Sequence, residues 1–133
     1  MRVLALDYGS ARCGCALSDP TGTLATPIDP VERPATRKGL ARLAALVRER
    51  GAERVVVGLP IGLSGSDTAQ TREARAFAER LRGAVPVPVE LFDERFTTAI
   101  AARARDARAS EDSRAAAVLL EDWLVRHREE VAG

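Results

Sequence analysis

The hydrophobic and polar positions of the chain follow two patterns, one typical of buried strands and the other of amphipathic helices. Short apolar runs without alternation occupy residues 3–6 and 54–58, as in strands that are covered on both faces of a sheet. Residues 13–17, 23–31 and 87–92 are also rich in strand-forming residues and are bounded by turn formers. The pattern predicts five strands, of which the first three form an antiparallel meander.

Apolar positions spaced three and four residues apart replace these runs elsewhere and predict helices. The first begins after Thr36, a residue type common at helix N-caps, and stops at Gly51. The second begins near Asp67, with Gln70 three residues later as in a capping box, and is closed by Gly83.

Two further helices are predicted near the end of the chain, a short one over 98–108 and a last one over about 111–128. On the last helix, Trp123 falls on the apolar stripe and is expected in the core, whereas His127 is expected at the surface. The order βββαβαβαα implies an α/β fold with a mixed sheet and helices on both faces. Pro88 cannot donate to a ladder, so the fifth strand is expected at an edge.

The composition limits the partners and the environment. With 133 residues, 46% hydrophobic and 29% charged, the chain is expected to form a single domain over residues 1–133 without a membrane span. A formal net charge of +1 gives no general attraction to nucleic acid, so such binding would need local patches. Cys13 and Cys15 are too few for a zinc site or a disulfide framework and are expected as packing residues. Asp7 comes too early for a signal-peptide core, so a cytoplasmic protein is expected.

Carboxylates occur where predicted strands stop and where the last helix starts. Asp7 ends the first strand and the pair Asp93–Glu94 ends the fifth, so both belong to the rim where sheets of parallel strands bind ligands. Asp112 shares a helical stripe with Trp123 and is predicted to face the sheet, where an unpaired carboxylate would be costly.

Three carboxylates that converge at one rim need cations. Two Mg²⁺ or Mn²⁺ ions about 4 Å apart would balance their charge and bind a scissile phosphate. Oxygen ligands without nearby His or Cys favour these ions over zinc. Each acid also has a structural reading: a turn former at Asp7, first-turn acids at Asp93 and Glu94, and a helix-dipole contact at Asp112. Those readings do not explain why all of them fall on one rim.

Four sequence blocks run in order over nearly the whole chain. They are LDYGSARCGCALSD at 6–19, VGLP with LSGS at 57–66, DERFTT at 93–98 and DSRAAAVLL at 112–120. In this order they resemble the YqgF (RuvX) family, which comprises Holliday junction resolvase-like proteins and pre-16S rRNA processing nucleases with a ribonuclease H-like fold.

The resemblance implies a five-stranded sheet in the order 3-2-1-4-5 and assigns catalysis and metal binding to Asp7, Glu94 and Asp112. Asp93 is a further metal-ligand candidate, because the sequence does not decide which of two adjacent acids points inward. The implied activity is a Mg²⁺- or Mn²⁺-dependent, two-metal hydrolysis of phosphodiester bonds. The implied reaction is 5′-end maturation of the 16S rRNA precursor in ribosome biogenesis, with RNA or ribosomal particles as partners.

Arg12 and Arg95 lie beside the acid motifs and are candidates for binding phosphates that flank the cut, with an ion pair to a neighbouring acid as the alternative. Thr97 and Thr98 are expected to be helix caps first and phosphate donors second. The stretch 103–111 is basic in the family and is diluted here by two acids, which predicts weaker RNA binding and leaves the chemistry unchanged.

Three other functions stay open. A Holliday junction resolvase acting on branched DNA would need a twofold homodimer, whereas a nuclease for rRNA could work as a monomer. A non-catalytic RNA- or ribosome-associated factor would bind without cutting. Asp7-x-Gly9 with Gly14 also resembles the phosphate loop of sugar kinase and actin-like ATPases, which close two such domains around a nucleotide.

Overall fold

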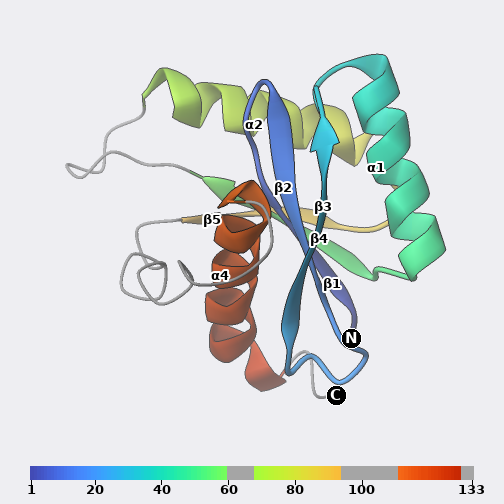
Figure 1. The fold of residues 1–133 in the computed structure, drawn as a ribbon, viewed down its shortest axis with the longest axis vertical. Helices are drawn as coiled ribbons and strands as arrows, with labels where there is room; N and C mark the ends of the chain where they lie inside the picture. Colours follow the sequence, from blue (N-terminus) through green and yellow to red (C-terminus); the bar gives the residue numbers. More distant parts are fainter. Residues whose placement is uncertain (60–67, 94–110, 130–133) are drawn as a thin grey trace.

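The computed structural model of the chain describes residues 1–59, 68–93 and 111–129, with side chains in the last segment described from Ser113 onward. The helix predicted over 98–108 lies outside these residues. None of the helices in the three segments has the length and apolar character needed to cross a membrane. The elements, drawn in Figure 1, are β1 (Val3–Asp7), β2 (Arg12–Ser18), β3 (Ala25–Glu32), α1 (Arg37–Arg50), β4 (Arg54–Leu59), α2 (Ala69–Arg82), β5 (Val89–Asp93) and α4 (Glu111–Arg126).

The strands form one sheet in the order β3-β2-β1-β4-β5, which confirms the expected order. β1 pairs antiparallel with β2, and β2 with β3, because short turns connect them. β1 pairs in parallel with β4, and β4 with β5, because the chain passes through a helix before each new parallel strand. The carboxyl ends of β1, β4 and β5 therefore lie at the same end of the sheet.

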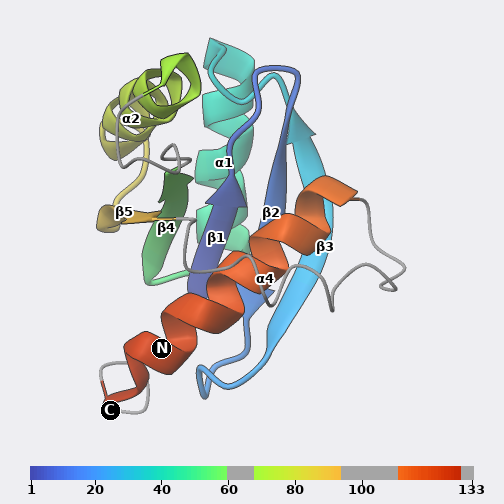
Figure 2. The same cartoon turned by 90° about the vertical axis from the view of Figure 1, so that its left-hand side faces the viewer.

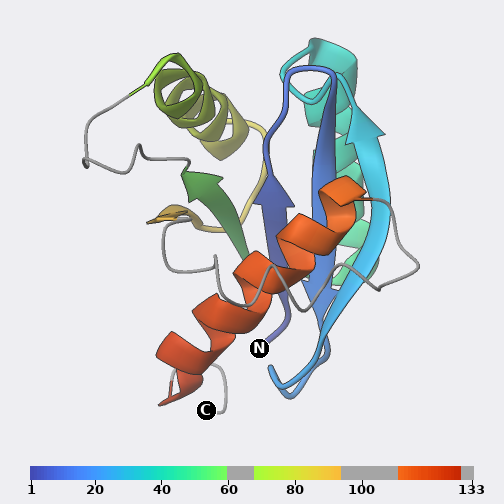
Figure 3. The same ribbon diagram turned by 60° about the vertical axis from the view of Figure 1, so that its left-hand side comes forward.

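Helices cover both faces of this sheet, as the β–α–β passages predict. α1 and α2 lie on one face and α4 crosses the other (Figures 2 and 3). Side-chain alternation along β1 sends Leu4 and Leu6 toward α1 and α2, and Val3 and Ala5 toward α4. Both faces of β1 are buried, which explains why its sequence is an unbroken apolar run.

The ends of α1 agree with the sequence pattern. The Thr36 hydroxyl accepts the N–H of Gly39 at 3.1 Å and caps the helix. Gly51 closes the helix with a φ of 67°, a left-handed conformation that glycine adopts without strain.

α2 begins one residue later than the sequence predicts. Its N-cap is Thr68, not Asp67, and the capping box is completed by Thr71, not Gln70. The Thr71 hydroxyl accepts the N–H of Thr68 at 3.1 Å, and the Thr68 hydroxyl accepts the N–H of Thr71 at 3.2 Å. The hydroxyls of Thr68 and Thr71 therefore form the capping box that was expected from Asp67 and Gln70. Gly83 closes the helix as predicted.

Proline marks both edge strands. β5 begins at Val89, two residues later than predicted, and the carbonyl of Pro88 accepts the N–H of Val55 at 2.9 Å just before it. The expected edge position of β5 is confirmed. β3, at the opposite edge, contains Pro27 and Pro30.

α4 packs on the sheet through the predicted apolar stripe. The stripe residues, each at most 1% exposed, are Ala116, Leu119, Leu120 and Trp123. The indole N–H of Trp123 donates to Glu90 of β5, and the guanidinium carbon of Arg54 lies 5.7 Å from its ring centroid. His127 is not a plain surface residue, because its ring stacks on Trp123 with centroids 4.1 Å apart.

Candidate active site

Asp7 and Asp93 are the last residues of two strands whose carboxyl ends lie at the same end of the sheet. Asp7 is the last residue of β1 and Asp93 the last of β5, with β4 between them. Val57 of β4 is level with Leu6 of β1 and with Leu91 of β5. The two acids therefore stand one and two residues beyond the same level, with two strand spacings of about 4.8 Å each between their backbones.

The two half-buried carboxylates belong to opposite faces of the sheet. Leu6 and Tyr8, on either side of Asp7, both pack toward α1 and α2, so Asp7 lies on the α4 face. On β5, Phe92 packs toward α4, so Asp93 lies on the face of α1 and α2. Of these two acids, Asp7 is the one on the face that α4 crosses.

A buried serine fixes the first turn of α4 to the sheet. Ser113 is 1% exposed. Its hydroxyl donates to the carbonyl of Ile28 in β3 at 2.6 Å and accepts the N–H of Cys15 in β2 at 3.3 Å. Because the side chain bonds to two different strands, the start of the helix is fixed in both position and direction.

This contact places the start of α4 close to Asp7. Cys15 pairs with Leu6 of β1, and Asp7 is the next residue along that strand. Asp112 precedes Ser113 in the first turn of α4, so its backbone belongs to the same end of the sheet. The side chain of Asp112 lies outside the described residues.

The turn that follows β1 is held by a close backbone approach and a ring stack. A Cβ on Gly9 would lie 2.7 Å from the carbonyl oxygen of Arg12, closer than Cβ atoms come in proteins. Tyr8 stacks on Phe77 of α2 with ring centroids 4.6 Å apart. Burial raises the pKa of the Tyr8 hydroxyl and the carboxylate of Glu73 adds to the rise, so the hydroxyl stays protonated at neutral pH.

Arg12, one of the predicted phosphate contacts, stands at the start of β2, level with Glu32 of β3. Its Nε lies 4.0 Å from a carboxylate oxygen of Glu32, and the two side chains are 55% and 72% exposed. An exposed pair of this kind contributes about 0–1 kcal/mol. The guanidinium can therefore exchange this carboxylate for a phosphate at little cost.

The other predicted site residues fall outside the described part of the chain. They are Glu94, Arg95, Thr97 and Thr98, together with the basic stretch before α4. Within the described residues, no three His, Cys, Asp or Glu side chains form a metal-binding group. Asp7 and Asp93 are the members of the predicted ligand set whose side chains are described.

The chemistry of the described rim suits a hard divalent cation. Asp7 offers carboxylate oxygens, whereas Cys13 and Cys15 of the adjacent strand are fully buried in the core on the other face, as predicted. His127 lies after the far end of α4. Oxygen donors without sulfur or imidazole nitrogen are the ligands of Mg²⁺ or Mn²⁺.

Ser113 is a site-building residue that the sequence pattern did not single out. The available signal was a small polar residue on an apolar stripe, three residues before Ala116 and seven before Leu120. Such a residue is buried with the stripe and needs hydrogen-bond partners there. The packing role of Gly9 was also missed, because it depends on the return path of the chain.

Comparison with known sequences gives one family over almost the whole chain. Residues 1–126 match the sequence model of the RuvX family, described as Holliday junction resolvase. A protein of Anaeromyxobacter sp. strain Fw109-5 named "Putative pre-16S rRNA nuclease" is 46% identical over 132 residues, covering 93% of this chain and 96% of that protein. A protein of Mycobacterium leprae with the same name is also 46% identical over 132 residues, covering 92% of this chain and 72% of that protein.

Comparison with solved structures gives resolvases of the ribonuclease H-like fold. The RuvC protein of Thermus thermophilus, in complex with a Holliday junction substrate, has a TM-score of 0.66 at 15% identity, covering 97% of this chain and 96% of that chain. The yeast mitochondrial Holliday junction resolvase Ydc2 has a TM-score of 0.53 at 10% identity, covering 97% of this chain and 82% of that chain. At these identities the likeness concerns the fold, and it confirms the expected fold class.

Proposed function

Because the chain belongs to the RuvX family, we propose that it is a metal-dependent nuclease that matures the 5′ end of the 16S rRNA precursor during ribosome biogenesis. Nuclease activity is supported by the names of its relatives. The structural observation that carries the proposal is the position of Asp7, at the end of the central strand on the face that α4 crosses. A bacterial protein that acts on precursor rRNA would work in the cytoplasm.

In this proposal Asp7, Glu94 and Asp112 hold the metal ions. Asp7 and the first turn of α4 belong to the same end and the same face of the sheet. Asp93 lies on the opposite face from Asp7, which favours its neighbour Glu94 as the ligand from β5. The sequence leaves open whether Asp93 or Glu94 is the metal ligand, and substitution of each residue in turn can test this choice.

When bound, a pair of Mg²⁺ or Mn²⁺ ions would activate the attacking water and stabilise the leaving oxygen. The protein's own part is to hold Asp7 on a strand whose backbone is paired with Gly14 of β2, so that the carboxylate needs little reorganisation. Arg12, with residues 95, 97 and 98, would bind the phosphates beside the cut. In-line attack by water would break the bond to the 3′ oxygen and leave a 5′-phosphate and a 3′-hydroxyl.

A cleavage assay on a precursor-rRNA 5′ leader, with Mg²⁺ or Mn²⁺, tests this assignment. We expect Asp7→Asn to lower cleavage by at least about 100-fold while circular dichroism shows retained folding. Asp93→Asn removes the same charge at the same rim and is the matched control, which we expect to keep most of the activity. Glu94→Gln should behave like Asp7→Asn. Full activity of Asp7→Asn would exclude the proposed site, and loss in Asp93→Asn with activity in Glu94→Gln would reassign the ligand.

Junction resolution is the second candidate function, favoured by the description of the matching family. A resolvase cuts two strands symmetrically and therefore needs a twofold dimer. A four-way DNA junction assayed beside the precursor, with light scattering for the oligomeric state, separates the two functions. Paired symmetric cuts by a dimer, with the precursor intact, would replace the rRNA proposal. Metal-independent RNA binding that survives Asp7→Asn, with no cutting by the wild type, would indicate a non-catalytic factor.

A further inference from the structure

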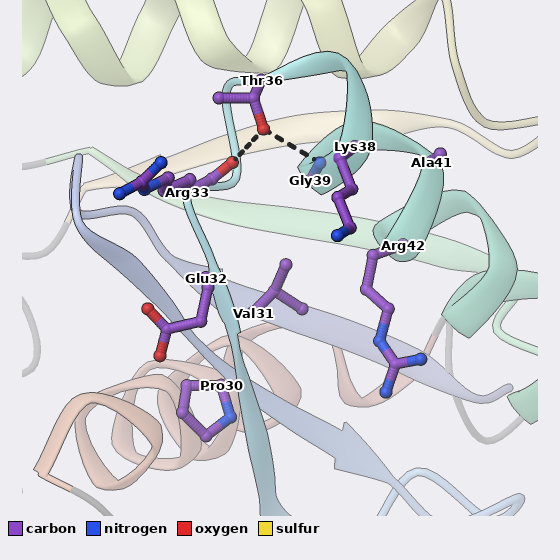
Figure 4. Close-up of a pocket in the computed structure, with 9 residues that line it drawn as sticks. All are labelled: Pro30, Val31, Glu32, Arg33, Thr36, Lys38, Gly39, Ala41 and Arg42. Carbon is purple, nitrogen blue, oxygen red and sulfur yellow. Dashed lines mark hydrogen bonds between the residues drawn. The ribbon is translucent and has the colours of Figure 1, made fainter.

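A hollow lined by cations opens beside the edge strand β3, with a volume of about 850 Å³. The last residues of β3 form its floor, and the first two turns of α1 form its wall (Figure 4). Lys38 and Arg42 extend from α1 on the same side of β3 as Val31. Arg33, at the turn between strand and helix, extends to the other side of the strand, as Glu32 does. Three lining residues are cations, and two of them, Lys38 and Arg42, extend into the same space beside α1.

Glu32, the acid among the lining residues, has its carboxylate next to Arg12. Arg33, Lys38 and Arg42 are exposed, and across residues 1–59, 68–93 and 111–129 none of their side chains forms an ion pair or a hydrogen bond. On α2 and α4, by contrast, Arg82 and Arg126 each face a carboxylate about one turn away. The chain carries a net charge of only +1. The hollow is thus a local concentration of positive charge on a nearly neutral protein.

Tight backbone packing holds the hollow in shape. A Cβ on Gly39 would collide with the carbonyl oxygen of Arg33 and lie 2.7 Å from the Cα of Pro34, so α1 approaches the end of β3 as closely as a glycine permits. The Thr36 hydroxyl donates to the same carbonyl at 2.7 Å and accepts the N–H of Gly39. The cations therefore project from a fixed frame, which lowers the entropic cost of binding a ligand.

The hollow continues the rim that carries Asp7. The N–H of Arg33 donates to the carbonyl of Ala11 at 2.9 Å, in the turn that follows β1. Arg12, the next residue, begins β2 and is level with Glu32 at the end of β3. A line from Asp7 over Arg12 to Arg33 stays at one end of the sheet. It crosses from the α4 face, on which Asp7 lies, to the α1 face, on which the hollow opens.

We propose that this hollow binds the phosphodiester backbone of the nucleic-acid strand that continues past the cleavage site. The inference rests on the proposed function and extends it to a second contact surface. Lys38 and Arg42 are about 6 Å apart along the helix axis, since each helical residue adds 1.5 Å, and they present charge along a line as a backbone does. The contacts are to phosphates, so they position the substrate without reading its sequence.

The alternative occupant, a protein strand added to the sheet, fits this edge poorly. β3 contains Pro27 and Pro30, which have no N–H to donate to a new strand. The charge of the hollow and its continuity with the rim instead suit a polyanion. Both a precursor-rRNA duplex and a branched DNA share that chemistry.

Binding titrations over a range of salt concentrations test the proposal on the 133-residue chain. The probes are a fluorescent precursor-rRNA duplex and a fluorescent four-way DNA junction, in buffer without Mg²⁺ or Mn²⁺ so that neither is cut. The test variant is Lys38→Ala/Arg42→Ala. The matched control, Arg48→Ala/Arg50→Ala, removes the same charge from the far end of α1. Thermal unfolding checks that each variant is folded.

We expect the test variant to bind more weakly. The negative slope of the logarithm of its binding constant against the logarithm of the salt concentration should become shallower by about 1.8, or about 0.9 for each lost contact to a duplex phosphate. In the control variant the salt slope should change by less than half of this amount. Under cleavage conditions the test variant should raise KM and leave kcat unchanged. Glu32→Gln should bind more tightly than the wild type, because it removes a repelling carboxylate and releases Arg12.

The outcomes separate this inference from the proposed function. If the wild type cuts nucleic acid and the test variant keeps its salt slope and KM, the hollow is not a substrate contact and the nuclease stands. If the wild type binds with the expected slope changes and cuts nothing, the contact surface stands and the nuclease falls. A slope change confined to one probe identifies duplex RNA or branched DNA as the ligand that reaches the hollow.

Discussion

Gly9 allows the chain to turn back immediately after Asp7, because its hydrogen leaves room for the carbonyl oxygen of Arg12. The returning strand β2 then pairs with β1, with Gly14 opposite Asp7. A side chain at position 9 would push the turn away from the strand pair that holds the carboxylate. The glycine of the first sequence block is thus explained by sterics alone, before any ligand contact is considered.

Gly9→Ala should be destabilising and should also impair the site. Its Cβ would lie 2.7 Å from a backbone oxygen that has no side-chain freedom to move away. We expect a loss of about 1–3 kcal/mol in unfolding free energy, as for overpacking elsewhere, measured by urea denaturation, and a further loss of cleavage activity.

Gly83→Ala is the matched control for this substitution. The nearest atom to its Cβ is 3.6 Å away, and the φ of Gly83 is −79°. The change should therefore be neutral or stabilise by about 0.4–1 kcal/mol through the unfolded state. Equal losses in the two variants would show that the steric reading of Gly9 is wrong.

Among the elements, α4 has the largest influence on the candidate site, because it crosses the face on which Asp7 lies. Its position is fixed at two points. Ser113 bonds to β2 and β3 at the rim. Trp123 bonds to Glu90 of β5 and lies under Arg54 toward the other end of the helix. The apolar stripe between them supplies most of the burial, and the polar contacts set the direction.

Ser113→Ala should loosen the rim end of α4. The substitution leaves the N–H of Cys15 and the carbonyl of Ile28 without this partner, which costs about 1–3 kcal/mol for a buried polar group. Because Asp112 lies in the same helical turn, we expect cleavage to fall at temperatures where urea titration shows the variant still folded.

Ser18→Ala provides the comparison at the opposite end of the sheet. Ser18 is equally buried, and its hydroxyl accepts the N–H of Val3 at 2.7 Å. We expect a similar loss of stability without a loss of cleavage in the folded protein. If both serine variants lose activity in proportion to stability, Ser113 has no positioning role.

For the molecule as a whole, the sequence predicted the features that depend on local pattern. The run at 3–6 is unbroken because both sheet faces are covered, and the stripe ending at Trp123 is buried as its spacing indicated. The strand order agreed with the family resemblance. Two features depend on where an element begins or ends, to the residue, and were not predictable. One is that Asp93 faces away from Asp7, and the other is that Thr71 completes the α2 cap. The roles of Glu94 and of the Asp112 carboxylate stay predictions.

Asp19, in the turn between β2 and β3, should contribute to the loss of stability of the fold in acid. Its carboxylate accepts hydrogen bonds from the Thr21 hydroxyl and from the N–H groups of Thr23 at 2.8 Å and Leu24 at 2.9 Å. These donors, the Thr21 hydroxyl foremost, hold the pKa of Asp19 well below its ordinary value. A folded-state pKa that lies below the unfolded one makes the charged carboxylate a stabilising group.

The contribution of Asp19 is therefore complete above its unfolded pKa of about 3.9 and is lost as the pH falls toward the lower folded-state value. Urea midpoints of the wild type and Asp19→Asn should differ most at neutral pH, with the wild type more stable, and should converge on acidification below about pH 4. Asp29→Asn, an exposed acid of β3, should change the midpoint little over the same range. A difference between wild type and Asp19→Asn that stays constant down to the lowest pH would mean that the loss comes from altered hydrogen-bond geometry and not from the charge.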